Sequence, residues 1–380
     1  MNEPKKIRLA IVADGVSQHA INRVKLLQDA SDLDLYFVHQ GPRMDNRTGL
    51  PGERFLQRDV YKGKNRAKRF WSSMQRLRWN VGTLRAIQPD IVFILFGEKI
   101  VLLSALLSPF PYILSAWGGD FLKEQGAQKN ALARLLLRRS VRKAKHIFAV
   151  SKELVRTIAD LGGTNIQHLY YGLDTRFFAP PPVGEGAVPG EFTVYSPRWC
   201  RPEYNLETIV RAFALFAKGR PDARLAYRDT DWADTEVAKA YRKKIQALIA
   251  AEGLQNRCIP LGFSDQAAHK AQMARSQVII SMAPSDGTPV SVLEAMSMGK
   301  IVVCGQIPSL SDLIEDKHTG FLAPLDDPHL IAGTLGYIYK NFEEVQRRVG
   351  ANARHFAENQ ADIHKEVAIY IDTLRKLPNR

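Results

Sequence analysis

Short apolar runs alternate with segments of helical spacing along most of the chain. Ile7 to Val12 and Gln277 to Met282 are two such runs, and each fits a strand that is buried in a sheet. Val290 to Met298 follows the second run with the spacing of a helix, after a turn from Pro284 to Pro289. Strands and helices that alternate in this way, with no short repeat, predict an α/β fold of doubly wound domains.

The longest apolar stretch, from Ile91 to Ala116, has nearly the length of a membrane span. Two charged residues and two prolines interrupt it: Glu98, Lys99, Pro109 and Pro111. These interruptions divide it into a strand, a helix and a strand, which predicts buried core of a parallel sheet and not a membrane helix.

A change of composition at residues 179–190 marks the expected domain boundary. This segment is rich in proline and glycine, as linkers are. We therefore expect a first domain at residues 1–180 and a second at residues 191–361. The spacing of Ile363, Val367, Tyr370, Ile371 and Leu374 predicts a further helix within residues 362–380.

The overall composition is that of an ordinary globular protein with two domains. The chain has 380 residues, of which 45% are hydrophobic and 24% are charged. Cys200, Cys258 and Cys304 are odd in number and have no C-x-x-C spacing, so we expect a reducing, cytoplasmic location. Residues 1–6 lead directly into the first strand, so no signal peptide is expected.

The positive charge is concentrated in the first half of the chain. The net charge is +14, and much of it lies in Lys62 to Trp79 and in Arg134 to Lys145. Four apolar residues recur at helical spacing among the basic ones of the first segment, namely Phe70, Trp71, Met74 and Leu77. This pattern suits a helix at an anionic membrane surface or near a lipid-linked pyrophosphate. The alternative is a solvated basic helix whose apolar stripe packs on the core. No nucleic-acid motif accompanies the charge, so no nucleic-acid partner is expected.

The turn and helix from Ser285 to Met296 carry the most informative candidate chemistry. Unpaired N–H groups at a helix N-terminus suit a diphosphate, and Gly287 allows the backbone a close approach. Glu294, one turn into the helix, is suited to accept the hydroxyls of a ribose, and Asp286 those of a group that the diphosphate carries. The alternative is that Glu294 is an ordinary surface carboxylate and Asp286 a charge favoured by the helix dipole.

The same segment resembles the E-x7-E motif of glycosyltransferase family 4, which runs into Leu-Glu-Ala-Met, a small residue and Gly. This chain has Leu293 to Lys300 in that place, and Asp286 replaces the first Glu. Downstream, Lys317 to Leu322 resembles a turn of the same family, with His318 in the place of its Asn.

A second match lies at the start of the expected second domain. Tyr195 to Trp199, followed by Ile209 to Phe213, is similar to the first strand and helix of the family's C-terminal domain. There the family has an Arg and then a Lys against the diphosphate. Arg198 matches the Arg, whereas the Lys is missing, and Arg201 is the candidate substitute. Its planar guanidinium binds phosphate with a different geometry from that of a Lys ammonium.

The first half matches less closely. Gly15 follows the first strand, where many α/β domains have a glycine. Tyr112 to Asp120 resembles the family's His-Gly-x-Asp loop, with Trp117 in place of the His, so imidazole chemistry is lost there. Ile147 to Leu154 is similar to the next strand and capped helix, and Tyr170 to Asp174 to the turn before the linker.

The resemblance implies the GT-B fold, in which two Rossmann-like domains face a cleft and a last helix packs back on the first domain. It also implies a retaining transfer of a hexose-type sugar from a nucleoside diphosphate sugar to an acceptor hydroxyl. The acceptor is expected to be a glycan or a lipid-linked glycan of cell-surface polysaccharide or glycolipid assembly. The enzyme would then be peripheral on the inner face of the cytoplasmic membrane. No cofactor and no metal are expected, because cationic side chains and a helix N-terminus stabilise the diphosphate.

The residues of the expected site follow from these matches. Those with expected catalytic roles are Asp120, Arg198, Arg201 and Asp286. Those expected to bind the donor are Gly15, Arg198, Arg201, Gly262, Phe263, Asp286, Gly287, Thr288, Pro289, Val290 and Glu294. Among these, the backbone at Gly262 and Phe263 is expected to meet the base, and Asp120 to orient the acceptor hydroxyl.

Three alternatives remain open at the level of the sequence. Arg228 to Asp231 contains a D-x-D triplet, which binds a divalent cation in the other common glycosyltransferase fold. A GT-B-like epimerase or phosphorylase would use the same donor site. A non-catalytic, membrane-associated GT-B scaffold would keep the fold without the chemistry.

Overall fold

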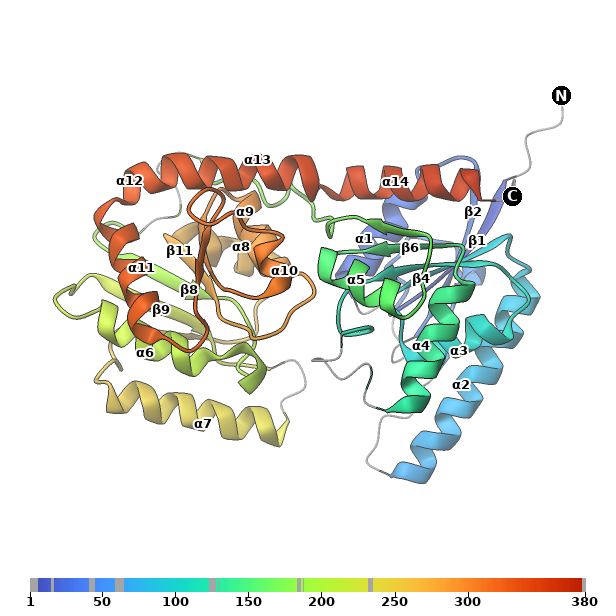
Figure 1. Cartoon of the computed structure of the whole chain (residues 1–380), viewed down its shortest axis with the longest axis horizontal. Coiled ribbons are helices and arrows are strands. Elements are labelled where there is room, and N and C mark those ends of the chain that lie inside the picture. Colours follow the sequence, from blue (N-terminus) through green and yellow to red (C-terminus); the bar gives the residue numbers. More distant parts are fainter. Residues whose placement is uncertain are drawn as a thin grey trace. The chain divides into compact units, whose positions relative to one another are not determined.

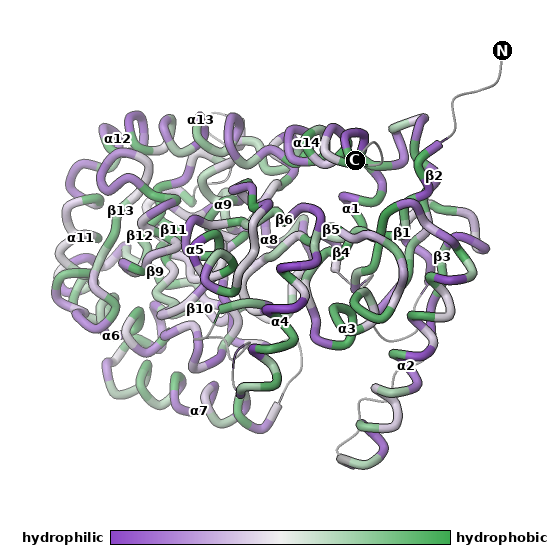
Figure 2. Tube along the Cα trace, turned by 45° about the vertical axis from the view of Figure 1, so that its right-hand side comes forward, coloured by the Kyte–Doolittle hydropathy of each residue, from purple (hydrophilic) through white to green (hydrophobic). Residues whose placement is uncertain are grey.

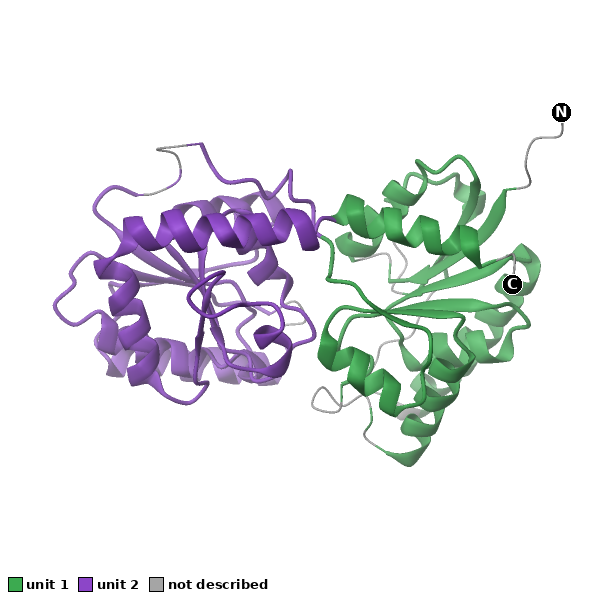
Figure 3. Ribbon diagram, turned by 45° about the horizontal axis from the view of Figure 1, so that its top comes forward, with its two compact units in different colours: residues 1–172, 363–380 green, residues 173–362 purple. Residues whose placement is uncertain are grey.

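The structure is a computed structural model and describes residues 6–14, 17–40, 45–58, 65–122, 128, 130–182, 186, 188–231 and 235–377 (Figure 1). The predictions for Gly15, Lys62 and Lys64 lie outside the described residues. The chain forms two compact units (Figure 3). Unit 1 comprises residues 1–172 and 363–380, and unit 2 comprises residues 173–362.

Unit 1 is built on a parallel sheet that has seven strands within the described residues, in the order β3-β2-β1-β4-β5-β6-β7. Its strands are β1 (Ile7–Ala13), β2 (Leu33–His39), β3 (Phe55–Leu56), β4 (Ile91–Leu95), β5 (Tyr112–Ala116), β6 (His146–Ala149) and β7 (Ile166–His168). The chain proceeds outward from β1 in one direction and from β4 in the other. The carboxyl ends of β1 and β4 therefore lie at a topological switch point.

Helices cover both faces of this sheet. They are α1 (Gln18–Leu27), α2 (Arg66–Ile87), α3 (Lys99–Leu107), α4 (Ala131–Lys143), α5 (Lys152–Asp160) and α14 (Ile363–Lys376). On one face α1 packs against α14, and on the other α3 lies between α2 and α4. This division follows from right-handed crossovers on opposite sides of the switch point.

The long apolar stretch of the sequence forms β4, α3 and β5, so the prediction of strand, helix and strand is confirmed. All residues of both strands are buried, as expected for the middle of a parallel sheet. Hydrophilic positions recur along α2 and α4 (Figure 2). No described helix is both long and apolar enough to cross a membrane.

Unit 2 repeats the same principle with six strands in its described part, in the order β10-β9-β8-β11-β12-β13. Its strands are β8 (Phe192–Ser196), β9 (Ala223–Arg228), β10 (Cys258–Leu261), β11 (Val278–Ser281), β12 (Ile301–Gly305) and β13 (Phe321–Ala323). Its helices are α6 (Leu206–Phe216), α7 (Glu236–Ala251), α8 (Gln266–Arg275), α9 (Val290–Ser297), α10 (Pro308–Ser311), α11 (Pro328–Lys340), α12 (Phe342–Val345) and α13 (Ala351–Gln360). The predicted strand before Met282 and the predicted helix from Val290 are thus confirmed.

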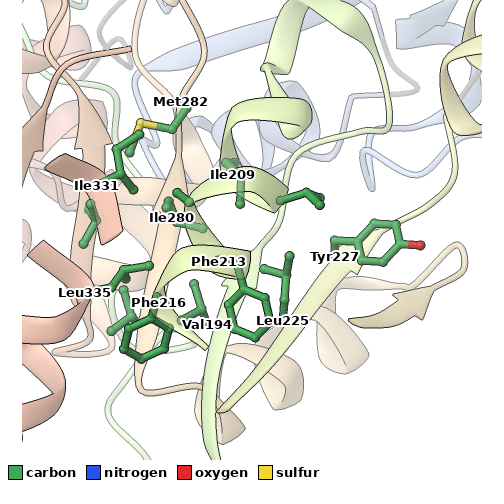
Figure 4. Close-up of a cluster of buried hydrophobic side chains, with 14 of the residues drawn as sticks. Val194, Ile209, Phe213, Phe216, Leu225, Tyr227, Ile280, Met282, Ile331 and Leu335 are labelled. Atoms are coloured by element: carbon green, nitrogen blue, oxygen red, sulfur yellow. The ribbon is translucent and has the colours of Figure 1, made fainter. Parts of the chain in front are cut away.

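One core cluster of unit 2 lies between its sheet and the packed helices α6 and α11 (Figure 4). Val194 of β8 and Ile280 of β11 are fully buried there, together with Phe213 of α6 and Leu335 of α11. The apolar face of α6 recurs every three or four residues, which is why this helix packs flat on the sheet. The core therefore fixes β8 against β11, the two strands at the switch point of unit 2.

Residues 173–180, which the sequence assigned to the first domain, cluster with unit 2. Leu173 forms a bridge with Asp362, the last residue of unit 2. Arg354 of α13 donates to the carbonyl oxygens of Thr175 at 2.9 Å and of Phe178 at 3.2 Å. These long-range contacts bind the segment to α13, and a composition shift alone does not reveal them.

A buried ion pair joins α14 to the rest of unit 1. The Nη2 of Arg23, on α1, lies 2.6 Å from the Oε2 of Glu366, on α14. Arg23 also donates to the carbonyl oxygens of His19 and Gly172, each at 3.0 Å. The other carboxylate oxygen of Glu366 accepts a 2.7 Å hydrogen bond from Tyr370. Burial and then the Glu366 carboxylate hold the pKa of Tyr370 well above its ordinary value, so its hydroxyl stays protonated and donates.

We expect Glu366→Gln to destabilise unit 1 by about 3 to 5 kcal/mol, because it leaves the guanidinium of Arg23 buried without a counter-charge. The double variant Arg23→Met and Glu366→Leu should lose less than the sum of the two single changes. Urea unfolding followed by circular dichroism measures both. The control is Asp32→Asn, which breaks the exposed pair of Asp32 with Arg375 of α14 and should change stability little. Equal losses from Glu366→Gln and the control would contradict the assigned role.

Candidate functional site

The switch point of unit 2 brings together two of the predicted site residues. Arg198 follows β8 and Asp286 follows β11, and these neighbouring strands are parallel. The Arg198 Nη2 and the Asp286 Oδ2 are 2.6 Å apart. Both side chains are largely buried, with 17% and 14% of their surface exposed. An ion pair thus lies where open α/β sheets bind their ligands.

Further contacts fix the positions of both partners. The guanidinium carbon of Arg198 lies 4.4 Å from the centre of the Tyr204 ring, in a cation–π contact. The Arg198 Nε is buried and has no hydrogen-bond partner among the described residues. The carbonyl oxygen of Asp286 accepts a 2.6 Å hydrogen bond from the hydroxyl of Ser309 at the start of α10. The side chains are therefore held in place, yet a strong donor of Arg198 remains unsatisfied.

The loop after Asp286 leads into the N-terminus of α9. Gly287 and Thr288 belong to this loop, and the Thr288 hydroxyl donates to the Gly287 carbonyl at 2.9 Å. Pro289 is the N-cap residue and Val290 begins the helix, with no side-chain hydrogen bond at the cap. The hydroxyl of Ser291, in the first turn, is buried without a partner in the described structure. These groups form a cluster of donors at the positive end of the α9 dipole.

Glu294 is buried in unit 2, with 6% of its surface exposed. The alternative that it is an ordinary surface carboxylate is therefore wrong. Its Oε2 lies 3.1 Å from the Nε2 of His269, on α8. No partner exists for its Oε1 among the described residues. Glu294 thus has one carboxylate oxygen engaged and one available.

An aromatic pair lies beside β8 and β10. The rings of Trp199 and Phe263 are stacked, with centres 6.3 Å apart and planes at 19°. The guanidinium of Arg228 covers the Trp199 ring at 4.3 Å. Phe263 is 77% exposed and follows Gly262, whose Cα has free space beside it. The pair presents one open aromatic face to solvent.

Arg201 has a different partner from Arg198. Its Nε is 3.1 Å from the Oδ2 of Asp231, whose side chain is fully buried. Asp231 is the second carboxylate of the D-x-D triplet, and Arg201 opposes its charge. Within the described residues, no group of three or more His, Cys, Asp or Glu side chains is arranged to hold a metal ion.

In unit 1, the carboxylate of Asp120 is buried among backbone N–H groups. It accepts hydrogen bonds from Gly97 at 3.0 Å, from Gly118 at 2.9 Å and from Trp117 at 3.2 Å. Burial raises the pKa of Asp120, and these N–H groups act against the rise. The indole N–H of Trp117 donates to the Ser115 hydroxyl at 2.9 Å. Asp120 therefore ties together the loops after β4 and β5.

Residues 66–79 of the basic segment belong to α2, but the predicted apolar stripe is split. Phe70 and Trp71 are 61% and 66% exposed, and Met74 is also exposed. Leu77 is buried, and so is Arg76, whose Nη2 lies 2.5 Å from the Oε1 of Glu98. The interpretation that the whole stripe packs on the core is thus wrong for its first three residues and correct for Leu77.

Sequence reasoning missed several residues that surround this site. They are Tyr195, Tyr204, Arg228 and His269, each in contact with a predicted site residue or with another member of this group. Tyr204 lies within residues 201–205, where the family's Lys is missing, Tyr195 begins the segment that resembles the family's first strand, and Arg228 precedes the D-x-D triplet. His269 comes from a helix that no motif marked.

Comparisons with known proteins identify the family of the chain. Residues 185–356 match the family model of the glycosyl transferases group 1, and residues 8–151 match the model of the glycosyl transferase 4-like family. The fold and the family models define a GT-B enzyme of the α/β class. The chain belongs to the glycosyltransferases of family 4 type.

One curated relative is the GDP-mannose:cellobiosyl-diphosphopolyprenol alpha-mannosyltransferase of Xanthomonas oryzae. It is 26% identical over 306 residues, which cover 77% of this chain and 73% of the relative. Among solved structures, the sucrose-phosphate synthase of Thermosynechococcus elongatus has a TM-score of 0.79 at 14% identity, with 98% of both chains covered. Anabaena HepE in complex with UDP and glucose has a TM-score of 0.74 at 16% identity, and covers 98% of this chain and 100% of its own. These structures show the GT-B fold.

We expect Arg198→Ala and Glu294→Ala each to lower sugar transfer by a factor on the order of 10 to 1,000, because each removes a charge-assisted hydrogen bond from an enclosed site. Initial rates over a range of donor concentrations measure the effect, and circular dichroism checks the fold. Glu344→Ala serves as control, since its one ion-pair partner within the described part of the chain is the exposed Arg348 of unit 2. Unchanged donor kinetics in both site variants would contradict the assignment.

Proposed function

We propose that this chain is a retaining glycosyltransferase that transfers a hexose-type sugar from a nucleoside diphosphate sugar to the hydroxyl of a glycan or lipid-linked acceptor. The process it serves is the assembly of a cell-surface polysaccharide or glycolipid. The observation that carries the proposal is the Arg198–Asp286 pair at the switch point, beside the donors of α9. Retention rests on the family resemblance alone.

The diphosphate is proposed to bind between Arg198 and the N-terminus of α9. The unsatisfied Nε of Arg198 and the unsatisfied hydroxyl of Ser291 are donors that an anion would complete. As the sugar leaves, negative charge grows on the diphosphate, and these fixed donors stabilise it. Asp286, opposite Arg198, is proposed to orient hydroxyls of the sugar. Arg201 is proposed to contact the diphosphate as well. Its guanidinium would then be shared between the diphosphate and Asp231.

The nucleoside is proposed to bind along the Glu294 side of the same unit. The free Oε1 of Glu294 is suited to accept a ribose hydroxyl, and the backbone at Gly262 and Phe263 to meet the base. The open ring of Phe263 adds an aromatic surface on which a base can stack. The solved HepE structure contains UDP, and the Xanthomonas relative is named for GDP-mannose, so both bases belong in a test.

On the acceptor side, the structure leads to one change from the sequence-based proposal. Asp120 receives three backbone donors, so we propose that it holds the loop at Trp117 and does not itself orient the acceptor hydroxyl. The Xanthomonas relative is named for a diphosphopolyprenol-linked acceptor, which supports a lipid-linked acceptor here.

We further propose that α2 docks the enzyme on the anionic inner face of the cytoplasmic membrane. Phe70, Trp71 and Met74 are exposed near the start of this helix. Lys68, Arg69 and Arg78 are exposed on the same helix. Aromatic rings among basic side chains suit insertion between anionic headgroups.

A panel of UDP-sugars and GDP-sugars, with and without a polyprenol-diphosphate glycan and with and without EDTA, tests the donor chemistry. We expect acceptor-dependent transfer from one donor, retention of the anomeric configuration by NMR of the product, and full activity in EDTA. Activity that is lost in EDTA, restored by manganese and abolished by Asp229→Ala would favour the D-x-D interpretation.

Other outcomes of the panel would favour the rival functions. A requirement for inorganic phosphate would indicate a phosphorylase, and conversion of the donor without any acceptor an epimerase. Absence of turnover with every donor, in a folded protein, would leave the non-catalytic scaffold.

For the membrane, we expect the triple variant Lys68→Gln, Arg69→Gln and Arg78→Gln to bind anionic vesicles on the order of 10- to 100-fold more weakly at low salt, because each basic residue adds about 1 kcal/mol. Turnover on a soluble acceptor analogue should stay nearly unchanged. Vesicle cosedimentation at low and moderate salt measures the binding. The control removes three charges from α7 by Lys239→Gln, Lys243→Gln and Lys244→Gln. Equal partitioning of wild type and both variants would contradict docking through α2.

A further inference from the structure

Glu294 is the end of a buried chain of polar side chains within unit 2. His269 joins its carboxylate to two other groups through the opposite ring nitrogen. The His269 Nδ1 lies 3.1 Å from the hydroxyl of Tyr195, on β8, and 3.4 Å from the Nη2 of Arg228, at the end of β9. All four side chains are buried. Four separate elements thus supply one continuous chain of contacts.

The chemistry of these groups fixes where the hydrogen of the His269 ring lies. A guanidinium has N–H donors and no acceptor, so Nδ1, which faces Arg228, must be the accepting nitrogen. Burial, opposed by Arg228, raises the pKa of Tyr195, so its hydroxyl is protonated and is a second donor to Nδ1. The hydrogen therefore lies on Nε2, where it is donated to the Oε2 of Glu294 at 3.1 Å.

We propose that His269, held as the Nε2–H tautomer by Arg228 and Tyr195, is a positioning residue that presents the free Oε1 of Glu294 to a ribose hydroxyl of the donor. This inference rests on the proposed function. A carboxylate on a helix rotates about its side-chain bonds, and one fixed oxygen removes most of that freedom. The contact between His269 and Glu294 thus prepares the carboxylate for the nucleoside before it arrives.

Arg228 extends the same arrangement to the base. Its Nη2 also lies 3.1 Å from the Ser264 hydroxyl, and its guanidinium covers Trp199, which stacks on Phe263. The buried guanidinium of Arg228 therefore contacts His269, which holds Glu294, and Trp199, which stacks on the exposed Phe263 ring. We expect the Arg228 side chain to align the two parts of the nucleoside site with each other.

Binding of deoxynucleotides tests the role of His269. Isothermal titration of wild type with UDP, GDP and their 2′-deoxy and 3′-deoxy forms should show an affinity loss on the order of 10- to 100-fold for at least one missing hydroxyl. The loss should nearly disappear in His269→Ala and in Glu294→Ala. It should persist in His269→Gln, because the amide nitrogen of Gln can replace the Nε2 donor. His355→Ala, on the exposed face of α13, is the control and should behave as wild type.

The outcomes separate the inference from the proposed function. If wild type binds neither diphosphate, the proposed function fails. If wild type discriminates and His269→Ala discriminates equally, the inference alone fails. Long-range 15N–1H NMR of the histidine rings, with His269→Gln to assign the signal, gives a second reading that needs no nucleotide. We expect the pattern of the Nε2–H tautomer; an Nδ1–H or doubly protonated ring would overturn the inference.

Discussion

The parallel pairing of β8 with β11 is the constraint on which the donor site depends. It places the segments that follow these strands at one edge, so Arg198 and Asp286 meet although 88 positions separate them in the chain. The core between the sheet, α6 and α11 keeps the two strands in register. Apolar residues with no chemical role thus determine the distance between the two charged groups that the chemistry requires.

Buried charge serves two purposes in this molecule. In the Arg23–Glu366 pair, Arg23 also donates to backbone carbonyl oxygens of unit 1, and Glu366 accepts from Tyr370. Arg198 also has a counter-ion, and its Nε, like that of Arg23, has no hydrogen-bond partner among the described residues. An unsatisfied donor costs stability in the free protein, and a ligand that completes it recovers that cost on binding. The two pairs differ in their place in the fold: Arg23–Glu366 joins α1 to α14, whereas Arg198–Asp286 lies at the carboxyl ends of β8 and β11, where open α/β sheets bind their ligands.

Local patterns in the sequence predicted the parts of the fold and the site that depend on neighbouring residues. The strand before Met282, the helix from Val290 and the division of residues 91–116 follow from apolar runs and their interruptions. His269 and Arg228 were missed because their contacts with Glu294 and Trp199 exist only after α8 and β9 have packed beside β8 and α9. Likewise, the helical period of α2 predicts its apolar stripe but not the point along the helix at which packing on the core begins. That point lies between Trp71, which is exposed, and Leu77, which is buried.

The position of α14 has a consequence for the order in which the protein folds during its synthesis. Val367, Tyr370 and Leu374 belong to the core of unit 1, although most of that unit is encoded before residue 173. Unit 2 is complete once residue 362 has left the ribosome, whereas unit 1 still lacks a helix and the carboxylate that neutralises Arg23. The unit that begins first is therefore the one that finishes last. Until then its α1 face exposes apolar surface to the cell and to the chaperones that bind such surface.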